Sequence, residues 1–310
     1  MDFRRIIAFG KSSHVVSLPK SWLVENKLKK GDLVYLDQDF DKLVITPKEK
    51  ENEREERKAV INSDGKDFKV IKREISSAFI KYNDYIIVQG KDLHKYSADI
   101  TKVMHNLIAL EIMEQSSEKI VARDFLKVED IKIKDYFKKE DIVVRSMFVD
   151  LMDPKFKNFD ELIERQNSVK RVYLLLLKVF KAIARDSMLI KKTDMSLDEI
   201  FKYYNYNTSI QNICFSLKVI AENIPKIKSA KNKKILIKIM KDLNDHYLSV
   251  MKTLYSNNQD TAYKLSEVRD QQIEYANKNF EVKSLEDVII LQRVVWILFE
   301  LHGALHKIYD

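Results

Sequence analysis

The first 47 residues constrain the chain most, because they contain a complete set of small elements with too little material for a core. Their apolar segments and turn residues predict two strands, one short helix and two further strands. A unit of this size buries too little apolar surface to offset the entropy of ordering its backbone. We therefore expect it to interleave with a second copy of itself. The resulting dimer would present two basic loops on one face, at a spacing suited to a DNA duplex.

Turn residues and a helix cap set the expected boundaries of these elements. Ser21 is expected to cap the helix, because its hydroxyl can accept a bond from a free backbone N–H group. The run Lys29–Asp32 is typical of a turn. The expected ranges are 3–10 for a strand that ends at Gly10, Lys11–His14 for a polar, basic tip, 15–19 for the second strand, 21–26 for the helix, and 33–36 and 43–45 for a hairpin around residues 37–41.

Length and composition limit the class of protein. The 310 residues suggest two or three domains, and a hydrophobic content of 45% is enough for packed cores. The single cysteine, Cys214, excludes an intrachain disulfide and a multi-cysteine zinc site, which fits a reducing cytoplasm. No apolar run approaches the roughly 18–20 residues of a membrane span, and no secretion signal is visible. We predict a cytoplasmic protein without membrane insertion, whose net charge of +8 permits polyanion binding.

Residues 48–128 predict a charged linker followed by a small α/β subdomain. Residues 48–57 contain no apolar side chain, which is the composition of a solvated linker. Over residues 58–128 the apolar pattern predicts the order strand, helix, strand, helix, strand, strand, which fits an open α/β sandwich with two helices on one face. The expected elements are a strand at 59–61, a helix at 68–81, a strand at 85–88, a helix at 93–106, and a hairpin of residues 107–113 and 119–125.

After residue 128 the helical period dominates, and six helices with short connections are expected. They suggest two three-helix bundles, residues 129–226 and 227–310, or one continuous array of helical hairpins. Ile210–Phe215 and Leu291–Trp296 share one pattern of apolar residues, Gln and an aromatic residue, each in the third helix of its triplet, which favours a duplication. The helices are expected at residues 132–152, 157–186, 196–223, 230–256, 259–279 and 284–309.

The first 47 residues resemble the SpoVT/AbrB swapped-hairpin family of DNA-binding dimers. The resemblance is carried by Gly10, Val15–Lys20, Leu28–Val34 and Leu43–Ile45. It implies a β-barrel shared by two chains. It also implies that basic residues of the first strand, of the loop after it and of the segment after the proline contact double-stranded DNA. The positions that match these contacts hold Arg4, Arg5, Lys11, Ser12, Ser13, His14 and Lys20.

A simpler interpretation is that Arg4 and Arg5 are solvent-facing strand residues and that the domain only dimerises. A basic pair that some members of the family carry in the helix is replaced here by Leu23 and Val24, which lowers the expected affinity per protomer. Phosphate contacts would give binding a steep salt dependence, whereas base reading would require the hydroxyls or His14 to reach a groove.

The helical half resembles PhoU-like phosphate-regulation domains, through Val169–Leu176 and the two third-helix segments. The whole layout is similar to archaeal AbrB–PhoU fusion regulators, including the insert with Leu110–Met113. The resemblance implies a multidomain α+β protein: a swapped-hairpin β-barrel dimer, a small βαβαββ insert and a PhoU-like pair of three-helix bundles.

PhoU-like domains hold multinuclear metal clusters through Glu-x-x-x-Asp motifs on their second and third helices, where an i,i+4 pair of carboxylates shares one helix face. This chain departs from that pattern, so we predict no metal and no other cofactor. His302 and His306 stand at the same spacing on the last helix, where a packing or surface role is the better interpretation. The replaced positions are Gln166, Lys170, Gln211, Phe215, Gln292 and Trp296.

These features predict a dimeric DNA-binding transcription regulator, not an enzyme, whose helical body receives a signal or a protein partner. A link to phosphate uptake or homeostasis follows from the resemblance alone. One alternative is a dimeric adaptor that does not bind DNA and docks on a phosphate transporter or a sensor kinase. Another is an enzyme or a metal-storage protein built on the helical bundle.

Overall fold

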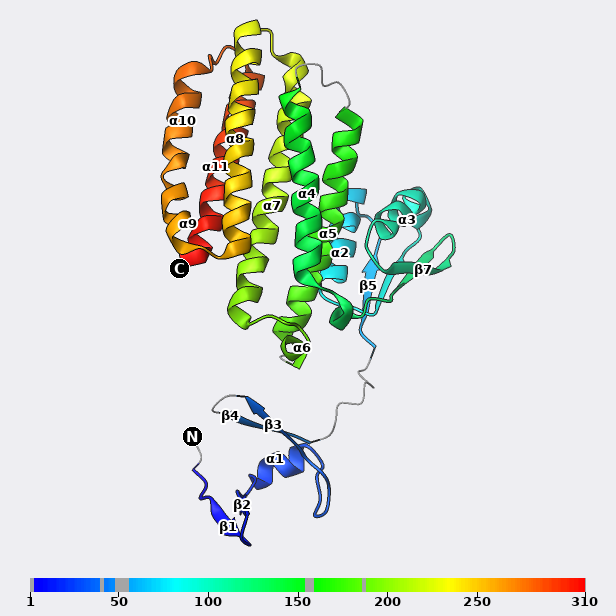
Figure 1. The fold of residues 1–310 in the computed structure, drawn as a ribbon. Coiled ribbons are helices and arrows are strands. Elements are labelled where there is room, and N and C mark those ends of the chain that lie inside the picture. Colours follow the sequence, from blue (N-terminus) through cyan, green and yellow to red (C-terminus); the bar gives the residue numbers. More distant parts are fainter. Residues whose placement is uncertain (1–2, 40–41, 48–55, 154–158, 186–187, 310) are drawn as a thin grey trace. The chain divides into compact units, whose positions relative to one another are not determined.

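The computed structural model describes residues 3–39, 42–47, 56–153, 159–185 and 188–309. The chain divides into two compact units, Met1–Glu55 (unit 1) and Glu56–Asp310 (unit 2). Of the predicted linker at 48–57, all but Glu56 and Arg57 lies outside the described residues. Each unit is described by itself below, with the element labels of Figure 1.

Unit 1 contains two small antiparallel sheets and one short helix. β1 (Ile7–Phe9) pairs with β2 (Ser13–Val15), and β3 (Tyr35–Asp39) pairs with β4 (Lys42–Thr46). α1 (Lys20–Glu25) lies between the two hairpins in sequence. The predicted order of two strands, a helix and two strands is confirmed. The described residues of a single chain form no closed barrel, because the two sheets are separate.

Several predicted boundaries in unit 1 are wrong. The first strand begins at Ile7 and not at residue 3, and residues 37–39 of the predicted hairpin loop are paired in β3. Ser13 and His14 belong to β2 and not to the tip, because Gly10 adopts a φ of +70° and allows a tight turn after which pairing resumes opposite Phe9. The second strand accordingly ends at Val15, well before residue 19. Ser21 does not cap the helix, because Pro19 occupies the N-cap position and the helix begins two residues earlier than a Ser21 cap requires.

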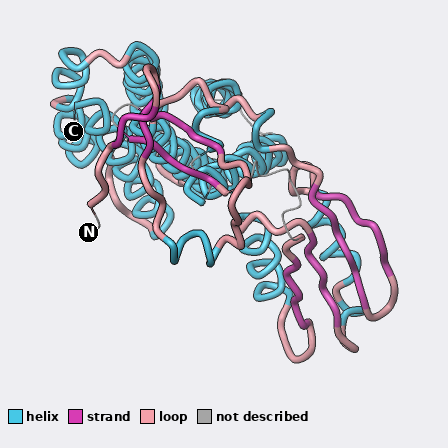
Figure 2. Tube along the Cα trace, turned by 90° about the horizontal axis from the view of Figure 1, so that it is seen from below, coloured by secondary structure: helices cyan, strands magenta, loops and turns pink. Residues whose placement is uncertain are grey.

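Unit 2 begins with a four-stranded sheet in the order β5-β6-β8-β7, whose strands are seen side by side in Figure 2. The β5–β6 pair is parallel and the other two pairs are antiparallel. Asp67 caps the first helix by accepting bonds from two backbone N–H groups. The predicted order is confirmed, with β5 (Lys58–Asn62), α2 (Phe68–Ile80), β6 (Tyr85–Gln89), η1 (Leu93–Lys95), α3 (Ser97–His105), β7 (Leu110–Gln115) and β8 (Lys119–Asp124).

One face of this sheet is buried by both helices, as the sequence predicts. Side chains alternate along each strand, so Ile86 and Val88 of β6 share a face and are both fully buried. They belong to one buried cluster with Ile75 of α2 and Met104 of α3. The partly buried Leu174 packs against the same cluster, although it comes from a helix far along the chain.

The remainder of unit 2 is helical. The long helices match the predicted ones within two residues at every end, except that the fifth predicted helix is interrupted at Glu267. Ser196 and Glu199 form a capping box at the start of one long helix. The elements are η2 (Val128–Asp130), α4 (Ile133–Met152), α5 (Phe159–Arg185), α6 (Met188–Lys191), α7 (Leu197–Asn223), η3 (Ile224–Lys226), α8 (Ala230–Ser256), α9 (Gln259–Ser266), α10 (Val268–Asn279) and α11 (Leu285–Tyr309).

The long helices lie side by side and share one continuous core (Figure 1). A single cluster of buried side chains joins Val144 of α4 and Leu217 of α7 to Met240 of α8 and Leu298 of α11. Helices on both sides of the predicted boundary at residue 226 therefore contribute to the same hydrophobic interior. The division into two three-helix bundles stays a prediction.

α11 is long and apolar enough, by length and composition alone, to cross a membrane, with a mean hydropathy of 1.7. Its inner face packs into the helical core through residues such as Val294, Ile297 and Leu301. It also carries the buried acid Asp287. Only 39% of the apolar window is buried, so packing against neighbouring helices accounts for part of this apolarity.

Candidate nucleic-acid interface

The β1–β2 hairpin brings four of the predicted contact residues together. Lys11 and Ser12 lie in the turn, and Ser13 and His14 are the first residues of β2. All four side chains are exposed. The Ser13 hydroxyl donates to the backbone carbonyl of Phe9, which closes the turn across its base. Ser13 therefore stabilises the hairpin, while Lys11, Ser12 and His14 remain the candidates for contact with DNA.

The other predicted residues flank the hairpin in sequence. Arg4 and Arg5 precede β1 and are exposed, and Lys20 is the exposed first residue of α1. His14 pairs across the hairpin with Ala8, whose small side chain leaves the imidazole uncovered on its face of the strand pair. The hairpin and its flanks thus offer exposed cations and hydrogen-bond donors, the groups that contact phosphate oxygens.

Sequence reasoning missed a second set of basic residues in unit 1. Lys27, Lys29 and Lys30 are all exposed and follow directly after α1. Lys27 has a φ of +55°, so the chain turns sharply here. The carboxylate of Asp32 accepts the backbone N–H of Lys29 at 2.7 Å and holds the next turn. The Lys-Lys-Gly run at residues 29–31 is the signal for this set, but its composition alone indicates only a turn.

Unit 1 exposes apolar side chains that a stable domain would bury. None of its described side chains is buried in the single chain. The exposed fraction is 88% for Phe3, 72% for Ile6, 81% for Leu33 and 63% for Leu36. Contiguous exposed apolar surface of this kind marks an interaction site. A second polypeptide surface must cover these side chains if unit 1 is to be stable in water.

The positions that replace the PhoU-type ligands differ in burial and hold no carboxylate. Phe215 and Trp296 are exposed on the outer faces of their helices, and the guanidinium of Arg293 lies over the Phe215 ring at 5.3 Å. Gln166 is buried in α5, whereas Lys170 one turn later is exposed. Gln211 buries its side-chain oxygen without a hydrogen bond. The part of the chain that the structure describes holds no group of three or more His, Cys, Asp and Glu side chains arranged for a metal ion. The absence of a metal stays a prediction.

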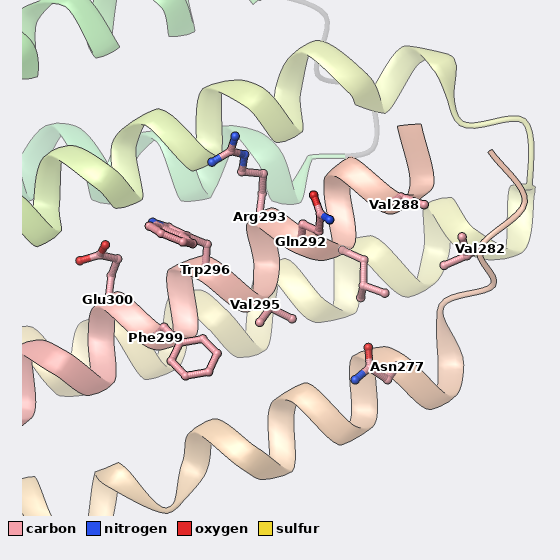
Figure 3. A pocket seen from close by; sticks show the side chains of 10 residues that line it. Asn277, Val282, Val288, Gln292, Arg293, Val295, Trp296, Phe299 and Glu300 are labelled. Carbon is pink, nitrogen blue, oxygen red and sulfur yellow. The ribbon is translucent and has the colours of Figure 1, made fainter. Parts of the chain in front are cut away.

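Gln292 and Trp296 instead line a groove beside α11, which we call the α11 groove (Figure 3). Its volume is about 940 Å³, at the upper end of the usual range for ligand sites. Trp296 and Phe299 each expose 51% of their surface. Asn212 of α7 donates to the carboxylate of Glu300 at 2.8 Å and so fixes one end of the groove.

Buried polar groups join α4 to the other long helices. Burial raises the pKa of Glu140 well above its usual value, because desolvation disfavours the charged carboxylate. With its amide nitrogen turned toward Glu140, Asn207 of α7 donates to both carboxyl oxygens, at 3.1 and 3.2 Å. The neighbouring Asp141 accepts hydrogen bonds from Tyr247 at 3.0 Å and from Tyr255 at 2.9 Å, both in α8. These groups are satisfied by one another, which indicates a structural role.

The last helix carries the histidine pair. The Nε2 atoms of His302 and His306 lie 2.9 Å apart, close enough for one ring to donate to the other. Their rings are in edge contact, and the His306 ring also contacts Tyr309. These contacts agree with the predicted packing role.

Comparison with known proteins identifies the N-terminal unit. Residues 7–53 match the family described as "Antidote-toxin recognition MazE, bacterial antitoxin". No curated protein and no solved structure matches the chain. The chain carries a MazE/AbrB-type antitoxin domain at its N-terminus, followed by a mostly helical C-terminal body. Domains of this type typically bind DNA and dimerise, and the candidate interface lies within the matched segment except for Arg4 and Arg5.

Proposed function

We propose that this protein is a cytoplasmic, dimeric transcription regulator that binds double-stranded DNA through unit 1 and does not act as an enzyme. The helical body would receive a signal and change the spacing or angle of the two DNA-binding heads. Its PhoU-like character, the likeness to archaeal fusion regulators and the link to phosphate uptake or homeostasis rest on the sequence resemblance alone.

This proposal depends on one observation, the exposure of apolar side chains throughout unit 1. A second copy of unit 1 offers the matching surface, because the same strands and the same apolar residues are present on both chains. Interleaved hairpins would bury Leu33 and Leu36, which are largely exposed in one chain, and would pair strand edges that otherwise remain open. Two β1–β2 hairpins would then lie in one particle, with Lys11 exposed at each turn.

Electrostatics gives the proposal a quantitative form. Each protomer would bring Arg4, Arg5, Lys11 and Lys20 toward the phosphate backbone. Every phosphate neutralised by such a cation releases condensed counterions, and the logarithm of the binding constant falls with the logarithm of salt concentration by about 0.9 for each neutralised phosphate. Affinity should therefore depend steeply on salt.

The test compares two variants that remove the same charge. Arg4→Ala with Arg5→Ala removes cations at the proposed interface, and Lys233→Ala with Lys234→Ala removes two exposed cations of α8 in unit 2, outside that interface. Fluorescence anisotropy with genomic DNA fragments at several salt concentrations gives the slope for each. We expect the Arg4/Arg5 variant to flatten the slope by about one for each phosphate that is no longer neutralised, and so by up to about four in a dimer. An equal slope in both variants and the unchanged protein overturns the proposed face.

The α11 groove favours a second candidate function, the dimeric adaptor that does not bind DNA. An apolar groove beside a helix accepts an amphipathic helix of a partner protein through its apolar face, and Trp296 and Phe299 are the aromatic anchors on this chain. The same DNA-binding measurement separates the two functions. A regulator prefers particular genomic fragments, whereas an adaptor shows only weak binding that is equal for all fragments.

A further inference from the structure

A groove between α2 and α5 is lined by positively charged side chains. Its volume is about 510 Å³, and both helices belong to unit 2. The cations are Lys69, Lys72 and Arg73 from α2, and Lys170 and Lys181 from α5. The residues lie about 100 positions apart in sequence, so only the fold brings them together. We call this site the α2–α5 groove.

Helical periodicity directs these side chains to the groove and holds its walls in place. Lys69, Lys72 and Arg73 recur at spacings of three and four, and so they share one face of α2. The opposite face of α2 is buried against the sheet through Ile71 and Ile75. Leu174, between the two α5 cations, packs against the same sheet core. The groove is therefore built on rigid elements, which favours a defined site over a mobile surface.

The cations of the groove lack counterions. Among the described residues, none of the five forms an ion pair or a hydrogen bond through its charged group. The carboxylates on the flanking helices are already engaged: Glu74 pairs with Lys66 at 2.8 Å, and Glu222 pairs with Lys218 at 3.3 Å. Like charges that share a groove repel one another, so an anion placed among them would be stabilised.

Lys170 is affected both by desolvation and by its basic neighbours. Its side chain is solvent-accessible, yet desolvation by the surrounding protein lowers its pKa, and the charges of Lys72 and Lys218 lower it further. An anion bound in the groove would reverse the charge contribution and favour the protonated ammonium.

We propose that the α2–α5 groove binds a compact chain of phosphates, either a free inorganic oligophosphate or the phosphate end of a nucleotide. Arg73 can hold a phosphate by two parallel N–H···O bonds, and lysines supply flexible point charges to the remaining oxygens. The hydroxyl of Ser77 lines the groove and adds a further donor. The proposed phosphate site does not depend on DNA binding by unit 1.

The length of the charged wall favours a chain over a single phosphate. Lys170 and Lys181 are separated by 11 positions, which corresponds to about 16 Å along the axis of α5. One phosphate ion cannot contact both ends of such a wall. The apolar part of the lining is aliphatic, Ile80 and Leu174, with no aromatic ring among the described lining residues on which a base would stack. These features make the phosphate chain, and not a base, the part that is recognised.

Isothermal titration calorimetry on the full-length protein tests the site, with sodium tripolyphosphate, ATP and citrate as probes. Lys72→Gln with Arg73→Gln removes two groove cations. Lys233→Gln with Lys234→Gln is the matched control, because it removes the same charge from an exposed face of α8. We expect the groove variant to weaken tripolyphosphate binding by at least about tenfold, the effect of removing one or two charge-assisted hydrogen bonds. The control should stay within about twofold of the unchanged protein.

The other probes distinguish the sources of the ligand. Equal binding of ATP and tripolyphosphate supports a site that accepts the phosphate end of a nucleotide, whereas binding of tripolyphosphate alone supports a free oligophosphate. Citrate tests for simple attraction of a multivalent anion. Citrate binding as tight as that of tripolyphosphate, or an equal loss of tripolyphosphate affinity in both double variants, overturns the proposal.

Two further readouts exclude indirect causes. Both variants replace exposed side chains, so far-ultraviolet circular dichroism should show unchanged helix content and melting temperature. A lower melting temperature in the groove variant alone would assign these residues a structural role and overturn the site. DNA affinity should also be the same in both variants. If only the groove variant loses DNA affinity while tripolyphosphate binding persists, the groove is a nucleic-acid surface and the proposal fails.

Discussion

Single buried polar residues in unit 2 differ in how their groups are satisfied. Glu140 and Asp141 are surrounded by donors from neighbouring helices. His246 of α8 is only 4% exposed, and neither of its ring nitrogens has a hydrogen-bond partner among the described residues. Desolvation lowers the pKa of His246 to about 4, and the nearby His302 contributes in the same direction. The fold therefore requires this imidazole to be neutral.

This requirement predicts a loss of stability in mild acid. The folded pKa of about 4 lies below the unfolded value of 6.5, so the unfolded chain binds the proton more readily. The stabilisation is complete above pH 6.5 and is lost as the pH falls toward 4. The size of the effect is about 3 kcal/mol over this window. Urea unfolding of the full chain, followed by helical circular dichroism from pH 7.5 to 4.5, measures it.

Substituting His246 tests whether this residue causes the pH dependence. His246→Met keeps a side chain of similar size and removes the titrating group, so the variant should lose less stability than the unchanged protein between pH 6.5 and 4.5. His105→Met replaces an exposed histidine at the end of α3 and should leave the pH dependence unchanged. Identical acid profiles for the His246 variant and the unchanged protein would contradict the prediction.

At the scale of elements, the long helices and the order of strands were predictable because each leaves a periodic apolar pattern. The starts of α7 and α8 follow the capping residues Ser196 and Ser229, which a sequence shows directly. The interruption at Glu267 has no such signal in the sequence, since no Gly or Pro lies near it. The start of β2 at Ser13 was also missed, because it depends on how tightly Gly10 turns the chain and not on hydropathy.

One ion pair joins two elements whose contact no local pattern predicts. The ammonium of Lys178 in α5 contacts the carboxylate of Asp124 at the end of β8, and both side chains are almost completely buried. Lys178 also lies over the Phe79 ring of α2 at 4.3 Å. In the sequence Lys178 only interrupts an apolar run. Its role depends on a partner 54 positions away.

Breaking this pair should be costly. Lys178→Met leaves the Asp124 carboxylate buried without its partner, and we expect a decrease of about 3–5 kcal/mol in the free energy of unfolding. Adding Asp124→Asn should recover most of the lost stability. The backbone N–H of Leu126 donates to Asp124 Oδ1 at 3.1 Å, and the asparagine amide oxygen can still accept this bond. Chemical denaturation of the single and double variants measures both changes.

An exposed pair provides the comparison. Lys134 and Glu199 join α4 to α7 at 2.9 Å, with 45% and 40% of their side chains exposed. Lys134→Met should cost less than about 1 kcal/mol. If Lys178→Met costs no more than Lys134→Met, the buried pair does not hold α5 to the sheet in the way we describe.

For the molecule as a whole, the size of unit 1 predicts that it needs a partner surface, and the exposed fractions show which side chains such a surface would cover. That the partner is a second copy stays a prediction. The basic hairpin was also predictable, since its residues are neighbours in sequence. The α2–α5 groove was not, because it forms between helices distant in sequence. The α11 groove was missed although the residues that line it, 277–300, are near one another in sequence. Buried acids such as Glu140 were not predictable either, because helical periodicity does not reveal which polar residue on a mixed face becomes buried.

The assembly through unit 1 leads to a prediction about oligomeric state. Leu36→Asp changes a side chain of β3 that is 63% exposed in one chain, a site where a monomer tolerates an acid with little effect. In a dimer this position is covered, so the variant should sediment as a monomer and bind DNA weakly. Analytical ultracentrifugation at micromolar concentration measures the difference.

The matched control is Ile142→Asp in α4, where the side chain is 65% exposed in unit 2. This variant should sediment like the unchanged protein. A monomeric unchanged protein, or a Leu36 variant that remains dimeric, would contradict assembly through unit 1.

The contact of Lys178 with Asp124 also decides where this chain can be cut. A fragment that started after residue 128 would keep Lys178 but lack Asp124. It would also lack the sheet residues against which Leu174 packs. The Lys178 ammonium would lose the Asp124 carboxylate at a newly exposed apolar surface, and such a truncation should aggregate on expression. A fragment that starts at Glu56 retains both halves of the contact and is the smallest piece of the helical region that we expect to purify intact.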